Sequence, residues 1–462
     1  QVGVLSTFDY HFSNQLSIIE NLDLHNYNWA RISLCYLIDF IKNHQENLIK
    51  KLELPLLFQS KRSLYLGNRA LEQLNVLPNN SQGIQNKSLF DIINNNKSIL
   101  GRRFLKDQLV NPLIDSDKLN NRYNLISLFL ESSVDDSIGI YLETIYDLDK
   151  IVRRCEIGII DPCELWKLYV TLKSFNSIID CLESESKSII NSLDADKIKE
   201  LKINSTEVIS DFEKTFDLDI LSTKKFTTVY IEDDQTIFNR EYDESLDNII
   251  NQIETCNNFL NNLVTGISNL IEEKNYMNKE TKLCDVKFNE RDGHYLVITK
   301  RRQKMMIEKI NSNDKKEIKV GSIRMKLDEL EFIDLPKSNN VKIRCDKLNN
   351  LSGELVKYKI NLVRKTKELF YKYSSEFIAE RGIFLKEISN KLSYIDFINS
   401  GALTSLKNHY IKPLIEINSS KKRKSFFEAK KMRHPIVEYI NENFKYCPHD
   451  ISLGKELNGM LI

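Results

Sequence analysis

The stretch Tyr242–Leu270, YDESLDNIINQIETCNNFLNNLVTGISNL, decides the fold, because its apolar residues recur alternately three and four positions apart. This spacing is typical of a helix whose apolar seam packs against a second helix, as in a coiled coil. A second stretch, Leu348–Leu369, repeats the spacing and is interrupted once, at Lys365. About thirty residues at 1.5 Å each predict an antiparallel arm of roughly 45 Å.

The segment between the two helices, Lys282–Arg344, is expected to be a small β-rich tip. Tyr295, Val297 and Thr299 alternate with Leu296, Ile298 and Lys300, which is typical of a strand, and Val341–Arg344 is expected to be a closing strand. An arm with such a tip suggests a device that reaches around something. Periodicity alone equally allows two ordinary core helices with a hairpin insertion.

Basic residues gather at the end of the predicted strand, where a loop is expected. They are Lys300, Arg301, Arg302 and Lys304, with Lys315, Lys316, Lys319, Arg324 and Lys326 in the following insertion and Lys342 and Arg344 on the closing strand. Such cations neutralise phosphates without reading bases, which gives salt-sensitive binding that does not depend on sequence. The alternative is a solvated charged loop.

The bulk composition narrows the class of protein. A chain of 462 residues is expected to form two to four domains, and only 14 glycines and 8 prolines favour long helices. A net charge of +1 excludes a global basic field, so DNA binding requires local patches. The eight cysteines form no C-x-x-C pair, which argues for reduced thiols and against a zinc site.

The ends and the hydropathy of the chain suggest an intracellular fragment. No apolar stretch of about 18 residues and no signal peptide are visible, so no membrane span is expected. The chain begins at Gln1 and stops within an apolar run at Ile462, and we interpret it as a piece of a longer protein.

Capping and stop signals predict helices before the arm. Residues Ala30–Leu52 are expected to form an amphipathic helix. Ser88, with Asp91 three residues later, predicts a capping box at the start of another helix. A helix after Ser98 is expected to pack closely at Gly101 and to stop at Asn111-Pro112. Asp161-Pro162 predicts another helix start, and Thr223–Asp234 a loop or hairpin.

Six motifs follow one another along the chain: Leu64–Leu74 (LYLGNRALEQL), Ser88–Asp91 (SLFD), Gly101–Leu105 (GRRFL), Pro112-Leu113, Asp147–Arg154 (DLDKIVRR) and Tyr242–Asp247 (YDESLD). In their order and spacing they resemble one known family, the MutS family of DNA mismatch-recognition ATPases. The resemblance implies a mainly α fold with a small β-rich insertion. In this interpretation a long antiparallel helical lever carries a clamp at its tip, and the edge strands of an α/β ATPase domain follow.

The resemblance also implies domain boundaries. They are residues 1–61 for the tail of a connector domain, 62–241 for the helical lever core, 242–281 for the ascending lever helix, 282–345 for the clamp, 346–424 for the returning lever helices and 425–462 for the start of the ATPase domain. Gly293–Lys300 is similar to the family's clamp strand, with His294 where an aromatic residue is usual. This similarity favours DNA contact by the basic residues at the tip.

Near the C-terminus, Arg433-His434-Pro435 resembles a tripeptide on the first strands of the family's nucleotide-binding domain. Tyr446–Asp450 is similar to an aromatic-x-Pro-Asn-Asp segment, which implies that Tyr446 stacks on adenine and that His449 replaces the usual Asn. Tyr446 as a plain core aromatic is the alternative, and His434 is interpreted as a structural histidine. The basic run Lys421–Lys424 has three alternative interpretations: a solvated loop, a nuclear-import signal or a phosphate contact.

Gly459–Ile462 resembles the strand that leads into a P-loop. The loop itself, Gly-x-x-x-x-Gly-Lys-Ser/Thr, binds the phosphates of ATP or ADP and Mg²⁺ and is absent from the 462 residues. This chain alone is therefore expected to be inactive, whereas its parent is expected to hydrolyse ATP.

The predicted function is to clasp double-stranded DNA and to couple the clamp to nucleotide state through the lever. The parent is expected to form a homodimer or heterodimer through the ATPase domain and to meet a MutL-like partner. A helical coiled-coil scaffold without DNA or nucleotide is the alternative, and it does not account for Arg433–Pro435. A structural-maintenance-type ATPase arm would need longer heptads. The composition resembles MutS proteins of large DNA viruses and some organelles, and mismatch repair, recombination and cellular compartment stay open.

Overall fold

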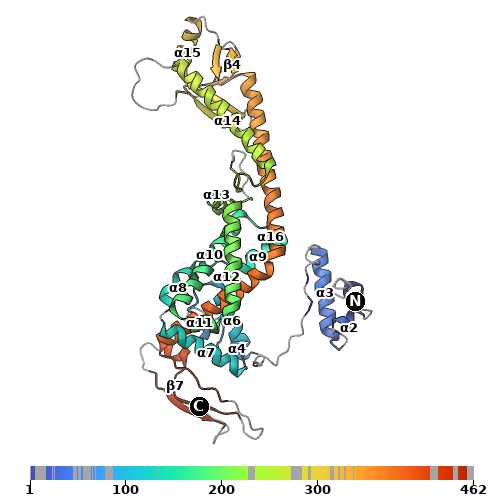
Figure 1. Cartoon of the computed structure of the whole chain (residues 1–462), viewed down its shortest axis with the longest axis vertical. Helices are drawn as coiled ribbons and strands as arrows, with labels where there is room; N and C mark the ends of the chain where they lie inside the picture. The colour runs from blue at the N-terminus through green and yellow to red at the C-terminus, as the bar shows by residue number, and fades with distance from the viewer. Residues whose placement is uncertain are drawn as a thin grey trace. The chain divides into compact units, whose positions relative to one another are not determined.

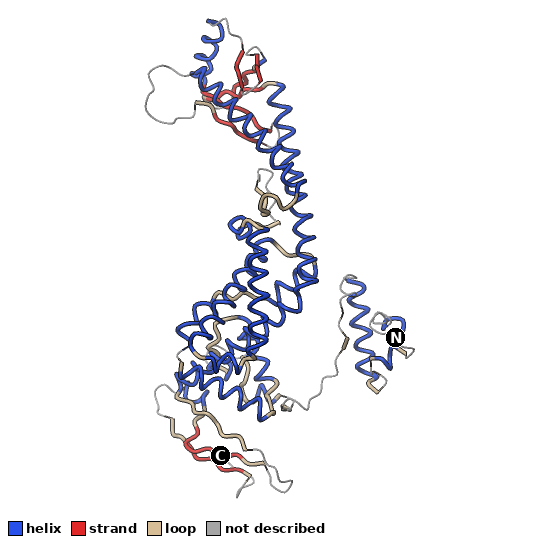
Figure 2. The backbone as a smooth tube through the Cα atoms, in the orientation of Figure 1, coloured by secondary structure: helices blue, strands red, loops and turns tan. Residues whose placement is uncertain are grey.

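The computed structural model shows a mostly helical chain with small antiparallel sheets (Figures 1 and 2). The residues that the structure describes are 2–5, 17–22, 24, 26–44, 49, 52, 54–55, 64, 66–67, 69–78, 87–132, 134–226, 235–271, 283–289, 293–312, 317–320, 323–326, 329–336, 338–416, 425–440 and 446–454. The chain divides into two compact units. The prediction of a mainly α fold with a small β-rich insertion is confirmed at this level.

The first unit comprises Gln1–Ile160, Glu164–Ser210 and Ser374–Ile462. Its elements include α1 (Val2–Leu5), α2 (Ile18–Asn21), α3 (Asn28–His44), α4 (Ala70–Gln73), α5 (Leu89–Ile93), α6 (Ile99–Val110), α7 (Ser116–Glu131), α8 (Val134–Glu143), α9 (Leu148–Ile157), α11 (Lys187–Ser192), β7 (Phe427–Met432), α17 (Pro435–Ile440) and β8 (His449–Leu453). Helices α10 (Pro162–Glu185), α12 (Ala195–Thr215) and α16 (Asp346–Asn408) contribute residues to both units.

Local capping decides where helices of the first unit begin and end. The Ser88 hydroxyl accepts a hydrogen bond from the Asp91 amide at 3.3 Å, and the Asp91 carboxylate accepts one from the Ser88 amide at 3.0 Å. This is the predicted capping box at the start of α5. Ser98 caps α6, which ends before Asn111-Pro112, so both predicted boundaries are confirmed.

Helix α10 contributes fully buried residues to the core of the first unit. Leu165, Leu168 and Leu172, which share one helix face, are all 0% exposed. A residue without its own amide proton is tolerated at the first position of a helix, and Pro162 is the first residue of α10, as predicted.

The second unit comprises Asp161–Cys163 and Asp211–Tyr373. It contains α13 (Leu218–Thr223) and α14 (Glu244–Ile271), and 28 residues give α14 a length of about 42 Å. The predicted seam is buried at Leu246, Ile253, Cys256, Leu260, Leu263 and Ile267 in α14 and at Leu348, Leu355, Leu362 and Leu369 in α16. Lys365 is half-buried and lies 3.4 Å from Glu368.

The sheet of the second unit has the strand order β1-β2-β6-β5, and all its pairs are antiparallel. The strands are β1 (Asp285–Asn289), β2 (Gly293–Thr299), β5 (Glu331–Asp334) and β6 (Asn340–Arg344). Both predicted strands, β2 and β6, are therefore central and lie side by side. Helix α15 (Lys300–Ser312) contacts both of them, and the hairpin β3 (Glu317–Val320)–β4 (Ile323–Lys326) contacts α14 through β3.

Two predicted helix ends were wrong. Helix α3 ends at His44, whose Nδ1 lies 2.8 Å from the carbonyl oxygen of Phe40, rather than at Leu52. Returning helices were expected over 346–424, and α16 ends at Asn408, because His409 adopts a left-handed φ of 54°. A left-handed residue at this position closes a helix.

The tripeptide Arg433-His434-Pro435 was expected on a strand, but Arg433 and His434 connect β7 to α17 and Pro435 is the first residue of α17. Proline lacks an amide proton and its fixed φ suits the first turn of a helix, so Pro435 begins α17. Three other predictions fall outside the described residues in whole or in large part: the loop or hairpin over Thr223–Asp234, the basic run Lys421–Lys424 and the strand Gly459–Ile462.

Within the described ranges, no helix is long and apolar enough to cross a membrane. All eight cysteines are free thiols, and seven of them are buried or half-buried. The described side chains also contain no cluster of three or more histidine, cysteine or acidic residues that is suited to a metal ion.

Candidate nucleic-acid interface

The predicted basic loop is the first turn of a helix. Strand β2 ends at Thr299 and α15 begins at Lys300, so the expectation of a loop was wrong. The Thr299 hydroxyl accepts a hydrogen bond from the Arg302 amide at 3.4 Å, and the Lys300 amide donates to the carbonyl of Asn339 at 2.9 Å. These bonds fix the start of the helix against the end of the sheet.

We call Lys300, Arg301, Arg302 and Lys304 the basic turn. Lys300, Arg301 and Lys304 are exposed, whereas Arg302 is half-buried and donates from Nη1 to the carbonyl of Leu283 at 2.9 Å. Arg302 therefore stabilises the connection to β1, and the other three cations face solvent.

The charge of the basic turn opposes the helix dipole. A helix N-terminus carries a partial positive charge, so cations there destabilise the helix by a few tenths of a kcal/mol each. The first turn of α15 contains no acidic residue to offset this. The exposed cations at this positive helix end are suited to bind an anion.

One carboxylate on the neighbouring strand approaches the basic turn. Asp334 Oδ2 lies 2.9 Å from Lys300 Nζ, and the two side chains are 65% and 45% exposed. Exposed ion pairs contribute about 0–1 kcal/mol. The pair is therefore easily exchanged for a stronger anion.

Lys342 and Arg344 lie on β6, apart from the exposed cations. Lys342 is 4% exposed, and its ammonium lies 4.1 Å from the centre of the Tyr295 ring. In this conformation Lys342 presents no exposed ammonium to a phosphate, and Arg344 is half-buried. Of the insertion, Lys326 is exposed, Lys315 and Lys316 lie outside the described residues, and the Lys319 and Arg324 side chains are not described.

His294 fastens the other end of β2 to α16. Its amide donates to the Ser352 hydroxyl at 2.5 Å, its ring lies 4.8 Å from that of Phe288, and Gly293 before it has a φ of 68°. Burial lowers the pKa of His294 to about 4, and the charge of Lys359 lowers it in the same direction. The imidazole is therefore neutral at physiological pH and acts as a packed aromatic ring.

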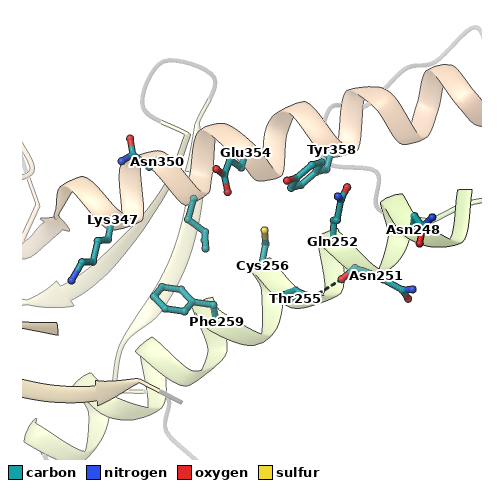
Figure 3. Close-up of a pocket in the computed structure, with 11 residues that line it drawn as sticks. Asn248, Asn251, Gln252, Thr255, Cys256, Phe259, Lys347, Asn350, Glu354 and Tyr358 are labelled. Atoms are coloured by element: carbon teal, nitrogen blue, oxygen red, sulfur yellow. Dashed lines mark hydrogen bonds between the residues drawn. The ribbon is translucent and has the colours of Figure 1, made fainter. Parts of the chain in front are cut away.

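A groove of about 890 Å³ lies between α14 and α16. Gln252 and Cys256 from α14 point toward Glu354 and Tyr358 of α16 across it (Figure 3). Burial raises the pKa of the Cys256 thiol, and the charge of Glu354 raises it further. The thiol is therefore protonated at neutral pH and is no nucleophile.

The two candidate nucleotide residues lie together near the strand pair β7–β8. The ring centres of Tyr446 and His449 are 6.2 Å apart at an angle of 79°, with Tyr446 half-buried and His449 exposed. His434 caps α17, because its Nδ1 accepts a hydrogen bond from the Val437 amide at 3.3 Å. The structural interpretation of His434 is confirmed.

A second polar cluster lies in the first unit, and we call Lys97, Ser98, Gly101 and Asp396 the polar junction. Asp396 on α16 is 0% exposed and accepts hydrogen bonds from the Ser98 amide, the Ser98 hydroxyl and the Lys97 amide at 2.8, 2.6 and 3.0 Å. Gly101 is required, because an added Cβ would lie 2.2 Å from Asp396 Oδ2. The predicted close packing at Gly101 is thus confirmed.

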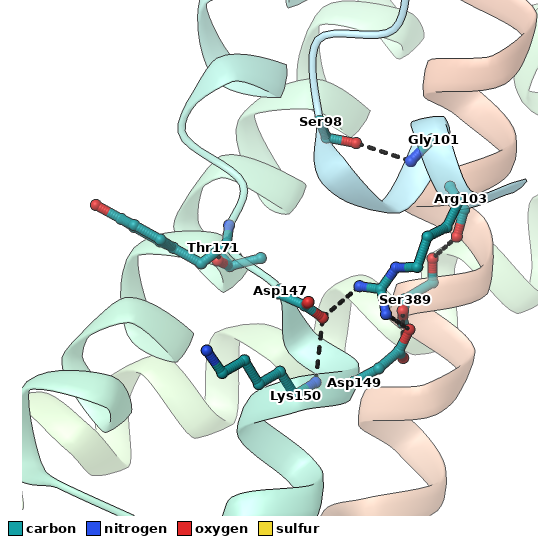
Figure 4. A network of polar contacts seen from close by, with 10 residues as sticks. Ser98, Gly101, Arg103, Asp147, Asp149, Lys150, Thr171 and Ser389 are labelled. Atoms are coloured by element: carbon teal, nitrogen blue, oxygen red, sulfur yellow. Dashed lines mark hydrogen bonds and ion pairs between the residues drawn. The ribbon is translucent and has the colours of Figure 1, made fainter. Parts of the chain in front are cut away.

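Ion pairs extend this contact to α9 (Figure 4). Arg103 pairs with Asp147, which also caps α9, and lies 3.6 Å from Asp149. Asp149 accepts a hydrogen bond from the Ser389 hydroxyl of α16 at 2.8 Å. The exposed faces of Arg102 and Lys106 agree with a solvated helix surface.

Sequence reasoning missed two features of these sites. Thr299 before a run without glycine or proline was a usable signal for a helix start, and it was read as the end of a strand followed by a loop. The pairing of Asp334 with Lys300 joins residues 34 positions apart, and no local pattern predicts it.

Comparison with known proteins gives a family. A family model described as MutS domain III matches residues 69–402. A putative DNA mismatch repair protein mutS homolog of Acanthamoeba polyphaga mimivirus is 28% identical over 466 residues, which cover 97% of this chain and 40% of that protein. A mitochondrial DNA mismatch repair protein mutS homolog of Sarcophyton glaucum is 29% identical over 454 residues, which cover 95% and 41%.

A bacterial relative, the DNA mismatch repair protein MutS of Streptococcus mutans, is 21% identical over 429 residues, which cover 92% of this chain and 44% of that protein. The chain therefore spans less than half the length of these relatives.

Proposed function

Because the chain belongs to the MutS family, we propose that it is part of a DNA mismatch repair protein and grips duplex DNA through the basic turn of α15. In this proposal α14 and α16 are the lever and the four-stranded sheet with α15 is the clamp. The strands β7 and β8 belong to the edge of an ATPase domain. The observation that carries the proposal is the exposed run Lys300, Arg301 and Lys304 at the start of a helix without a first-turn acid.

The local charge supports a polyanionic partner. Residues 282–345 contain 16 lysines and arginines against 10 aspartates and glutamates, whereas the whole chain has a net charge of +1. Phosphate contacts release counterions from DNA, and this term does not depend on base sequence. A clamp of this kind holds many DNA sequences and leaves the recognition of a mismatch to another part of the protein.

The carboxylate of Asp334 would compete with a DNA phosphate for Lys300 of the basic turn. Asp334 holds Lys300 at 2.9 Å in an exposed pair of small net energy. A DNA phosphate offers Lys300 a second negative group next to Arg301 and Lys304, so we expect exchange of the carboxylate for the phosphate on binding.

Nucleotide is proposed to act at Tyr446 and His449. Their adjacent rings offer an aromatic face for adenine and a polar edge beside it. The P-loop and Mg²⁺ are assigned to the parent protein, together with a homodimer or heterodimer and a MutL-like partner. Movement at this site would reach the clamp along α16, whose 63 residues span about 95 Å.

The direct test is duplex binding by the parent protein carrying R301E together with K304E. Both side chains are exposed, so we expect no loss of folding and at least a tenfold weaker duplex Kd in fluorescence anisotropy at about 100 mM salt. Arg302 is left intact because it bonds the Leu283 carbonyl.

The matched control is K372E, since Lys372 is also exposed but lies 26 residues, or about 39 Å of helix, after the start of α16. The control is expected to change the Kd by about twofold or less. Equal binding by wild type and R301E/K304E, with K372E also unchanged, would refute the clamp assignment.

A further inference from the structure

The motif Arg433-His434-Pro435 joins the end of the longest helix to the candidate nucleotide residues. We propose that Arg433 is a positioning residue that clasps the C-terminus of α16 to α17, so that movement at Tyr446 and His449 is passed to α16. This inference rests on the proposed function and names the residue that would carry its coupling step.

The C-terminus of α16 needs an external donor. The last carbonyls of a helix have no partner within it. The Tyr410 amide satisfies the carbonyl of Ser405 at 3.0 Å after the left-handed residue His409. Arg433 Nη2 donates to the carbonyl of Asn408 and lies 3.5 Å from that of His409. A cation at this end also complements the helix dipole.

The other side of the same guanidinium holds α17. Arg433 Nη1 lies 2.9 Å from Glu438 Oε1, one turn into that helix. His434 and Pro435 supply the cap and the first residue of α17, so the helix begins directly after the arginine. The planar fork of arginine therefore bridges two helices at once, which a lysine ammonium cannot do with the same geometry.

Arg433 lies next to a residue of β7 that pairs with one of the candidate nucleotide residues on β8. Strands β7 and β8 are antiparallel, and Met432 of β7 pairs with His449 of β8. Arg433 is the next residue after Met432. A displacement of His449 would therefore reach Arg433 through the paired residue Met432.

The far end of α17 also contacts the start of α5 within the first unit. Tyr439 receives a contact from Lys87, whose ammonium lies 4.2 Å from the centre of the ring, and Lys87 immediately precedes the capping residue of α5. Helix α17 is therefore held at its start by Arg433 and near its end by Lys87. A short element held at two points moves as a body, and Arg433 is the contact that includes α16.

The test measures coupling and not only stability. In the parent protein, duplex Kd is measured with and without the non-hydrolysable analogue AMP-PNP, and AMP-PNP Kd with and without duplex. The coupling ratio is the factor by which one ligand changes the Kd of the other. It must be the same for both ligands, because coupling is reciprocal, and we expect about 5- to 150-fold for wild type. For R433A we expect each separate Kd to stay within about threefold and the coupling ratio to fall by at least about fivefold.

A conservative variant separates positioning from simple capping. R433K keeps the charge at the helix end but loses the fork. We expect R433K to recover the thermal stability of wild type while its coupling ratio stays low. If R433K restores the ratio to the wild-type value, the arginine is only a cap and the inference is overturned; if R433A does not fold, R433K decides by the same criterion.

The control is R153A, because Arg153 is an exposed arginine on α9 of the same unit. It is expected to leave the ratio unchanged, and an equal fall in R153A would overturn the inference. A wild-type protein that shows no coupling, or binds no duplex, contradicts the proposed function itself. A coupled wild type with an equally coupled R433A contradicts the role of Arg433 alone.

Discussion

The polar junction around Asp396 and the basic turn of α15 are both clusters of polar groups, and they differ in what satisfies them. Asp396 is fully buried and its partners are the amides and hydroxyl of two neighbouring residues. Arg301 and Lys304 are exposed, and no ion pair to them is found among the described residues. The first cluster closes upon itself and stabilises the fold, whereas the second costs the helix a little stability and leaves its charge for a partner.

The largest expected effect is a loss of folding stability when the polar junction is disrupted. Asp396→Ala leaves the buried Ser98 amide and the part-buried Lys97 amide without an acceptor, at about 1–3 kcal/mol each, so we expect a loss of about 4 kcal/mol in urea unfolding. Asp396→Asn keeps one acceptor and is the matched control, with a smaller loss expected at neutral pH. A loss below about 1 kcal/mol in the alanine variant would show that the junction is not self-contained.

Ionisation of Asp396 is expected to make the stability of the fold depend on pH. Burial raises the pKa of Asp396, and its hydrogen bonds to Ser98 and Lys97 oppose the shift without cancelling it. The folded state then binds the proton more tightly than the unfolded state. Stability from this group is therefore greatest at acid pH and falls as the pH rises above about 4. The Asn variant is expected to lack this component.

The half-buried His294 of the second unit is expected to give stability the opposite pH dependence. The pKa of His294 is lowered to about 4 by burial and then by Lys359, whereas an unfolded histidine titrates near 6.5. Stability from this group is full above about pH 6.5 and is lost as the pH falls to about 4, by about 3 kcal/mol. His294→Phe fills the same space with an aromatic ring.

Urea unfolding of wild type and His294→Phe at pH 7 and pH 4 checks this. The wild type is expected to lose about 3 kcal/mol more than the variant between the two conditions. Equal losses would mean that the imidazole is solvated and that this end of β2 is open.

The smallest expected effect concerns the one acid beside the basic turn. Asp334→Asn releases Lys300, and we expect a duplex Kd about two- to threefold tighter with a stability change below about 0.5 kcal/mol. Asp285→Asn is the matched control, since Asp285 is an exposed acid on the same sheet and changes the net charge equally. If both variants tighten binding alike, net charge rather than release of Lys300 is responsible.

The sequence predicted the elements that depend on local pattern. The capping box at Ser88, the strand β2 and most of the buried seam of α14 and α16 follow from patterns of a few residues, and all three were found. In β2 the residues Leu296, Val297 and Ile298 are all buried, so burial does not alternate along this strand. Interpretation of the basic turn failed at one step, because strand and helix meet between Thr299 and Lys300 without a turn residue. The cations were identified and their secondary structure was not.

Contacts between distant residues were beyond the sequence. Asp396 and Ser98 are 298 positions apart, and Arg433 bonds the carbonyl of Asn408 at the end of α16, which ends before the limit of the expected returning helices at residue 424. A guanidinium that caps one helix and pairs with another depends on where both helices stop. Because helix ends are the least certain part of a sequence-based interpretation, the role of Arg433 emerged only with the fold.

The most direct test of the central claim is the salt dependence of duplex binding. The logarithm of the binding constant is plotted against that of the salt concentration for the wild-type parent protein and for Arg301→Gln with Lys304→Gln. Each lost phosphate contact lowers the slope by about 0.9, so two lost contacts predict a slope that is shallower by about 1.8 for each variant chain that grips the DNA. An unchanged slope would place the DNA phosphates elsewhere and contradict the assignment of the basic turn as the DNA-binding surface.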